Sequence, residues 1–137
     1  MAEAGVAGRS VLARMGSVVD ATGAETIDES AVDGIDFGAV ERILFRTRRS
    51  VDPTTFPRPF APIDPALARR LAQARVRLVG TDAPSVDPET SKTLDAHHEL
   101  IRGEVAILES VVLTDVEPGE YTLIALPLKL VEADSSP

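Results

Sequence analysis

The sequence predicts an α/β domain, and three observations support this fold class. Short runs of Val, Leu and Ile at residues 43–45, 76–80 and 105–113 are typical of buried strands. Segments with helix-start signals lie between these runs, as in helix–strand units. Apolar residues make up 44% of the 137-residue chain, with no Trp and one Tyr, so one aliphatic core in a single domain is expected.

The first third of the chain is predicted to contain a strand and a helical turn. Residues 17–22 (SVVDAT) form a short β-type run that Gly23 closes. Asp28 suits the N-cap of a short helical turn, because its carboxylate can accept a hydrogen bond from a free backbone N–H group. Residues 1–16 carry little pattern and are expected to be a ragged helix or disordered, so the domain is assigned to residues 17–137.

Prolines and a cap define the next unit. Five prolines between residues 51 and 65 argue against a regular helix or strand there, because proline lacks an N–H donor and fixes φ. Asp64 followed by Pro65 places an N-cap before a favoured first helical residue. We therefore expect a helix over residues 65–74, followed by the strand at 76–80.

The last third is predicted to contain a helix and a hairpin. A helix is expected over residues 88–102, and the run at 105–113 (VAILESVVL) is the strongest strand signal in the chain. Residues 118–119 (Pro-Gly) match the centre of a type II turn, so residues 121–128 are expected to return antiparallel to that strand. Pro127 indicates that the returning strand lies at a sheet edge or ends there.

Composition argues against several classes of function. The net charge is −8, which disfavours binding to nucleic-acid phosphates or to anionic membranes. Arginines cluster at residues 46–49 and 69–77, and we interpret them as solvated loop ends and faces, because acidic residues surround them. The chain has no cysteine, which excludes disulfides and thiolate chemistry, and a cytoplasmic location is expected. No apolar run approaches the roughly 20 residues of a membrane span.

The two histidines of the chain are adjacent, at His97 and His98, in the predicted helix. Together with Leu94 and Ile101 they follow helical spacing, so the sequence predicts that they share one inward face. One interpretation is structural, with one core histidine bonded to a carbonyl and the other at the boundary. The other is functional, because neighbouring histidines on an inward face are unusual.

Glu109 lies inside a predicted strand, where a carboxylate is costly unless it is paired, protonated or metal-bound. Two explanations for this carboxylate therefore remain: it is paired with a buried arginine, or it has a functional role. A helix carrying His97 and a following strand carrying Glu109 can meet at one site, and imidazole with carboxylate suits zinc or another divalent metal. Two ligands do not complete a zinc site. Further candidate ligands are Asp82, Asp87 and Asp95, but nothing in their spacing requires them to bind a metal.

The loop at residues 80–87 has two interpretations. It can line a cleft, or it can be a structural turn in which Asp82, Ser85 and Asp87 cap backbone donors, including the next helix start. The sequence contains no Ser-His-acid pattern, no G-x-S-x-G motif and no Gly-rich phosphate loop.

From residue 77 onward the chain resembles the C-terminal half of bacterial kynurenine formamidases (arylformamidases), which are hydrolases of the cyclase family. The blocks LVGTDAPSVDPETSKTLDAHH, VAILES, YTLIALPLKL and ADSSP carry the resemblance through their order and spacing. It extends weakly upstream through VERILFRT and VVDATG and covers roughly residues 17–137.

The resemblance implies a swivelling β/β/α cyclase-like fold, an oligomer, and metal-dependent hydrolysis of N-formyl-L-kynurenine to L-kynurenine and formate in tryptophan catabolism. It implies zinc or another divalent metal as cofactor. In the family, a His on the late helix and a Glu twelve residues later are metal ligands. His97 and Glu109 match this spacing, whereas His98 is out of register.

The chain departs from the family in one respect. The family motif H-x-G-T/A-H-x-D-x-P-x-H, which supplies the other ligands and the catalytic His, does not occur, and no histidine precedes His97. We therefore expect an incomplete domain, lacking the N-terminal strands and the metal motif, with an incomplete ligand set and no assigned catalytic residue.

The leading hypothesis is a formamidase by descent, impaired or inactive unless the other half is supplied. The alternatives are a non-catalytic remnant or assembly piece, and another cyclase-family amidase. A small-molecule substrate and a homo-oligomer are the expected partners.

Overall fold

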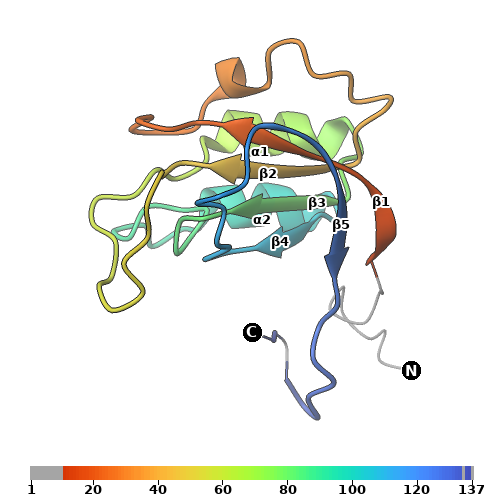
Figure 1. Cartoon of the computed structure of the whole chain (residues 1–137). Coiled ribbons are helices and arrows are strands. Elements are labelled where there is room, and N and C mark those ends of the chain that lie inside the picture. The colour runs from red at the N-terminus through yellow and green to blue at the C-terminus, as the bar shows by residue number, and fades with distance from the viewer. Residues whose placement is uncertain (1–10, 134, 137) are drawn as a thin grey trace.

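The chain folds into a mixed α/β structure, as the sequence predicts. The computed structural model describes residues 11–133, 135 and 136, and the side chains from residue 16 onward. In this part of the chain, one five-stranded sheet has the strand order β4-β3-β2-β1-β5 (Figure 1). β1 pairs in parallel with β2, β2 with β3, and β3 with β4, whereas β5 runs antiparallel to β1. The strands are β1 (Val11–Asp20), β2 (Arg42–Arg46), β3 (Leu78–Thr81), β4 (Ala106–Leu108) and β5 (Gly119–Ala125).

Two of the three described helices begin at the caps that the sequence indicates. The three are the 3-10 turn η2 (Glu29–Val32), α1 (Pro65–Gln73) and α2 (Asp95–Arg102). Asp28 accepts a 3.0 Å hydrogen bond from the N–H of Ser30 at the start of η2. Asp64 accepts a 2.7 Å bond from the N–H of Ala66 and confirms the predicted start of α1. Within the described residues, no helix combines the length and apolar character needed to cross a bilayer.

Helices α1 and α2 lie side by side on one face of the sheet, and the main core lies between them and the strands (Figure 1). Fully buried members of this core include Ile43 and Phe45 of β2, Val79 of β3, Leu71 of α1 and Leu100 of α2. A smaller cluster lies on the opposite face of the sheet, where Leu113 from the loop after β4 packs against residues of the strands. Its buried residues are Val18, Leu44, Leu78 and Leu113.

The four parallel strands end at one edge of the sheet, and this edge positions the candidate site. The loops that follow β2 and β3 extend together from it, on the left of Figure 1. Asp82, directly after β3, accepts hydrogen bonds from the N–H groups of Thr47 (2.9 Å) and Arg48 (3.0 Å) after β2. This carboxylate holds the two loops together, at the place where open parallel sheets commonly bind ligands.

Two element boundaries differ from the prediction. β1 begins at Val11, so residues 11–16 are strand and not a ragged helix or disorder. Residues 1–10 lie outside the described residues, and the division at residue 16 remains a prediction. α2 begins at Asp95 and not at residue 88, because the Asp87 carboxylate accepts the backbone N–H groups of Ala96 and His97 and fixes the helix start there.

The predicted hairpin between residues 105–113 and 121–128 is wrong. β4 ends at Leu108, and Ser110 adopts a left-handed conformation (φ 58°) that turns the chain away. β5 then pairs with β1, about 100 residues earlier in the chain. Pro127 lies just beyond the end of β5, which is an edge strand of the described sheet, as its missing N–H requires.

The interpretation of the first arginine cluster as solvated is wrong for Arg46. Its side chain is 2% exposed, donates a 2.7 Å hydrogen bond to the Val116 carbonyl and pairs with Asp20 at 3.1 Å. Arg49 pairs with the same carboxylate from the surface, as expected for a solvated arginine.

Candidate metal centre

His97 lies between two carboxylates in the structure. Its Nδ1 is 2.7 Å from Oδ2 of Asp87, and its Nε2 is 3.1 Å from Oε1 of Glu109. The three residues come from the loop after β3, from the first turn of α2 and from the residue directly after β4. The structure therefore brings the two predicted metal ligands, His97 and Glu109, into contact, and it adds Asp87 on the other side of the ring.

Asp87 fixes the orientation of the His97 ring. Its side chain is 3% exposed, and it also accepts hydrogen bonds from the backbone N–H groups of Ala96 (2.9 Å) and His97 (3.0 Å). Burial raises the pKa of Asp87 most strongly, but the bonds from His97 and Ala96 and the His97 ring together outweigh it and hold the pKa below its ordinary value. A carboxylate at this position favours a proton on Nδ1, and the ring then presents Nε2 on the side of Glu109.

Glu109 is not the buried strand residue that the sequence predicts. It follows the last residue of β4, and its side chain is 30% exposed, so no buried arginine is required to offset its charge. Oε1 accepts a 2.9 Å hydrogen bond from the backbone N–H of Val86, which ties it to the loop that carries Asp87. Glu109 is thus held at the sheet edge with one oxygen near Nε2 of His97.

The predicted inward face of the second helix is wrong. Leu94 precedes α2 in a left-handed conformation, and it and Ile101 are largely exposed. The buried face of α2 consists of Ala96 and Leu100, which both belong to the main core. The structural interpretation, with one core histidine bonded to a carbonyl, is also wrong, since His98 is exposed and the partners of the half-buried His97 are carboxylates.

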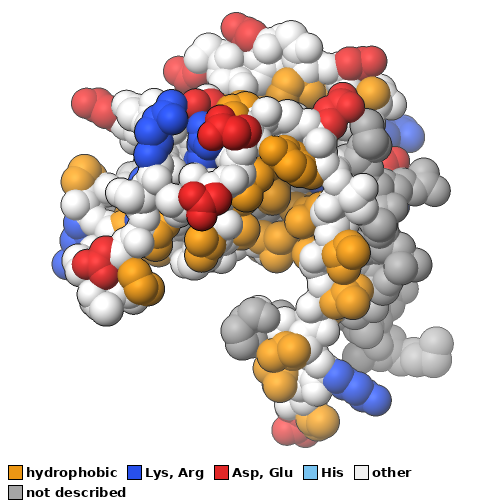
Figure 2. All heavy atoms as spheres, viewed as in Figure 1, with side chains coloured by type: hydrophobic (Ala, Val, Ile, Leu, Met, Phe, Trp, Pro, Cys, Tyr) orange, Lys and Arg blue, Asp and Glu red, His pale blue; other side chains and the backbone are white. Residues whose placement is uncertain are grey.

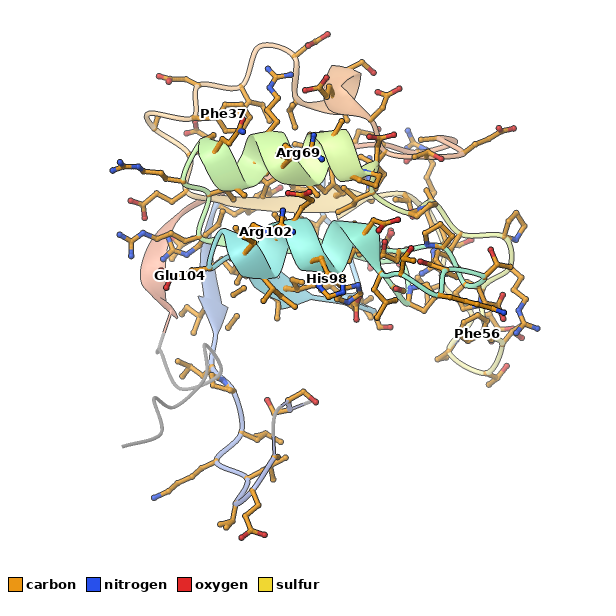
Figure 3. All side chains as sticks on the ribbon, turned by 180° about the vertical axis from the view of Figure 1, so that it is seen from behind. Phe37, Phe56, Arg69, His98, Arg102 and Glu104 are labelled. Carbon is orange, nitrogen blue, oxygen red and sulfur yellow. The ribbon has the colours of Figure 1, made fainter. Side chains whose placement is uncertain are left out.

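His98 lies apart from the site. It is exposed, and Figure 3 shows it on the side of α2 that faces away from α1. Arg69 of α1 and Arg102 of α2 are labelled in the same view. Arg69 pairs with Glu99 of α2 at 3.1 Å and so links the two helices, and Arg102 pairs with the same Glu99 at 3.1 Å within α2. Because His98 is exposed and lies apart from the site, His97 remains the metal-ligand candidate of the two histidines.

The structural interpretation of the loop at residues 80–87 is confirmed. Asp82, Ser85 and Asp87 all accept hydrogen bonds from backbone N–H groups, and Asp87 caps the next helix as expected. Of the three additional ligand candidates, Asp82 is committed to the loop after β2 and Asp95 to the hydroxyl of Thr93. Only Asp87 contacts His97.

The donor set of His97 and Glu109 fits a divalent metal in part. Two ligands about 2.0–2.1 Å from a tetrahedral zinc lie roughly 3.3 Å apart, close to the 3.1 Å between Nε2 and Oε1. The carboxylate on Nδ1 is the partner that metal-binding histidines usually have. Among the described residues, however, no group of three or more His, Cys, Asp or Glu side chains is arranged to hold one ion.

A shallow pocket of about 240 Å³ lies next to this arrangement without including it. Asp87 contributes to its wall with Asp64 and Asp95, but neither His97 nor Glu109 lines it. Its volume is below the roughly 300 Å³ of small-molecule sites. We therefore assign the candidate chemistry to the His97–Glu109 pair, at the carboxyl ends of the parallel strands, and not to this pocket.

Sequence comparison finds close relatives among curated kynurenine formamidases. The protein of Geobacillus thermodenitrificans is 53% identical over 111 residues, which are 81% of this chain and 52% of the relative. The proteins of Bordetella avium and Salinibacter ruber are 50% and 46% identical and match 71% and 83% of this chain, or 46% and 54% of their own length. The chain therefore spans about half the length of the curated relatives it matches. No protein-family profile matches it.

Solved structures share the fold. A potential metal-dependent hydrolase with cyclase activity superposes with a TM-score of 0.79 at 29% identity, over 92% of this chain and 62% of its own. A predicted metal-dependent hydrolase from Bacillus stearothermophilus gives 0.80 at 28% identity, over 98% and 67%. The chain is thus similar in sequence to kynurenine formamidases, over about half of their length, and similar in fold to metal-dependent hydrolases.

Proposed function

We propose that the chain supplies half of the metal site of a kynurenine formamidase, an enzyme that hydrolyses N-formyl-L-kynurenine to L-kynurenine and formate. The observation that carries the proposal is the contact of Nε2 of His97 with Oε1 of Glu109, at 3.1 Å, with Asp87 behind the ring. The names of the relatives and of the structural neighbours support the reaction class.

In this proposal each of the three residues has one task. His97 donates its Nε2 lone pair and Glu109 its Oε1 to a divalent ion, with zinc as the expected metal. Asp87 holds the Nδ1 proton and keeps the ring oriented, and its low pKa keeps it ionised in neutral solution. A divalent ion at such a site acts as a Lewis acid on an amide carbonyl and acidifies bound water.

Among the described residues no third donor joins His97 and Glu109, and two donors do not complete a zinc site, so we infer that the remaining ligands and the general acid for the leaving amine come from outside this part of the chain. We therefore expect the purified chain with added zinc to show no metal-dependent release of kynurenine. Combined with the part of the Geobacillus thermodenitrificans relative that the chain does not match, it should show turnover that a chelator abolishes.

Variants test the ligand assignment in this combined enzyme. His97→Gln and Glu109→Gln should each lower kcat/KM at least about 100-fold, more than the loss of an outer partner of a ligand. His98→Gln is the matched control, an adjacent exposed histidine that should change kcat/KM less than about twofold. Equal losses for His97→Gln and His98→Gln would contradict the assignment.

A structural role is the second candidate, and a specific observation favours it. Glu109 accepts a hydrogen bond from the backbone N–H of Val86, and Asp87 accepts one from the start of α2. These two carboxylates of the site therefore tie the loop after β3 to both neighbouring elements. A purely structural site predicts that His97→Gln lowers stability in the absence of metal and that zinc leaves the wild-type melting temperature unchanged. Ligation predicts that zinc raises that temperature in the combined enzyme.

A further inference from the structure

A series of exposed apolar side chains follows β5 into the segment after it. Residues 126–133, which we name the C-terminal arm, are all exposed. Side chains of β5 and of the arm are exposed by 69% (Ile124), 61% (Leu126), 58% (Leu128), 49% (Leu130) and 89% (Val131). Large apolar side chains exposed singly are ordinary, but a contiguous series of this kind marks an interaction site.

The backbone along this surface also has free hydrogen-bonding capacity. β5 pairs with β1 on one side and is an edge of the sheet on the other, as far as the described residues show. An exposed edge strand presents a row of unpaired N–H and C=O groups that can pair with another strand. Pro127 stops such pairing two residues after β5 ends, so an added strand would lie along residues 119–126.

The face of the sheet opposite the helices is hollowed next to the arm. Figure 2 shows hydrophobic side chains on the floor of this hollow, with the arm projecting beside it. Leu108, Val111 and Leu123 are only partly buried against the smaller cluster on this face, and Val112 is 69% exposed. The edge of β5, the arm and the hollow lie next to one another, and we name them together the open face.

The comparisons indicate what covers the open face. The solved neighbours share this fold over 92% and 98% of the chain, yet 38% and 33% of their own residues have no counterpart in it. The curated relatives carry about as many residues outside the matched part as within it. In those proteins the additional residues belong to the same molecule, and the helix face of the sheet is already occupied by α1 and α2.

We propose that the open face is the docking surface for a polypeptide equivalent to the unmatched half of a kynurenine formamidase chain. One of its strands pairs with the free edge of β5, and its apolar side chains cover the hollow and the arm. A second copy of this chain fits less well, because two copies with a net charge of −8 each would repel one another. The inference concerns assembly and does not require the metal site to be catalytic.

The test is co-expression of the whole chain with the unmatched half of the Geobacillus thermodenitrificans relative, without metal or substrate. Size-exclusion chromatography with light scattering should show a 1:1 complex, and hydrogen exchange should show protection of the β5 amides only in that complex. Homodimers of the chain without a complex, or no association at all, would overturn the proposal.

Paired variants locate the surface. Ile124→Asp combined with Leu128→Asp should raise the dissociation constant at least about 30-fold, the size of a hot-spot loss. Phe56→Asp is the matched control, because Phe56 is a similarly exposed apolar residue (53%) on the loop after β2, and it should leave the constant within about twofold. A complex that tolerates the double variant would contradict docking at the open face. Turnover of the complex is measured separately, so an inactive complex contradicts the proposed function alone.

Discussion

Removal of the Asp87 carboxylate tests whether one buried side chain organises the candidate site. In Asp87→Ala, the N–H groups of Ala96 and His97 and the His97 ring lose their acceptor. Loss of an ordinary helix cap costs about 1 kcal/mol, and a buried donor left without a partner costs about 1–3 kcal/mol. Ala96 is fully buried, whereas the His97 ring can turn toward water. We therefore expect the free energy of unfolding to fall by about 3 kcal/mol.

Asp64→Ala is the matched control, because Asp64 caps α1 through one bond near the surface, from the N–H of Ala66. Its expected cost is about 1 kcal/mol. Urea denaturation followed by circular dichroism measures both variants, and with a slope of about 1.5 kcal/mol per M the midpoints should shift by about 2 M and 0.7 M. Equal shifts in the two variants would refute the claim that burial and the second backbone bond set the cost at Asp87.

Three further predictions concern the body of the fold. Arg46→Ala should lower the free energy of unfolding by about 2 kcal/mol, because it removes a buried guanidinium and its hydrogen bond to the Val116 carbonyl, and Arg49→Ala, which removes the exposed partner of Asp20, by less than about 0.5 kcal/mol. Gly103→Ala should cost about 1–3 kcal/mol in urea denaturation, because the new Cβ would collide with the Cβ of Ala72 and lie 3.1 Å from its Cα. Hydrogen bonds from the Thr22 hydroxyl and N–H, and then Arg46, hold the pKa of Asp20 below its ordinary value, although partial burial opposes them. Its ionised form therefore stabilises the fold above about pH 4, this contribution is lost as pH falls through the folded pKa, and Asp20→Asn should show a smaller loss of melting temperature between about pH 5 and pH 2.

Local chemistry made the centre of the fold predictable from the sequence. Asp64 and Pro65 carry a helix start in two adjacent residues, and the structure begins α1 there. The apolar run at residues 43–45 is part of β2, whose five residues are all buried. These features depend on neighbours in the sequence, so no knowledge of the tertiary structure was needed.

Features that depend on distant residues were not predictable in the same way. The turn signal at residues 118–119 suggested a hairpin, but β5 pairs with β1, which lies at the other end of the described chain. The inward face of α2 was assigned from the helical spacing of Leu94 and Ile101 with the histidines, whereas the buried residues are Ala96 and Leu100. Which strand or helix packs against an element is decided by tertiary structure, which overrides local preference.

The candidate site lies between these two cases. The resemblance to a known family predicted His97 and Glu109 as a pair, and the structure shows their contact, while their role as metal ligands stays a prediction. Asp87 appeared in the sequence only as one of three possible additional ligands. Its position in the loop after a predicted strand suggested that it lies near a site at the carboxyl ends of the strands. Its contact with Nδ1 of His97 could be seen only in the three-dimensional structure.

The pairing of β1 with β5 also affects how the chain can fold. Val11 pairs with Ala125, so this part of the sheet closes a loop that includes almost every other element. During synthesis, β5 leaves the ribosome after all the other strands, and until then β1 has a free edge while β2, β3 and the helices can already assemble. Closing so long a loop is entropically costly and slow. The interval before β5 arrives is therefore the stage at which this chain is most exposed to aggregation through the edge of β1.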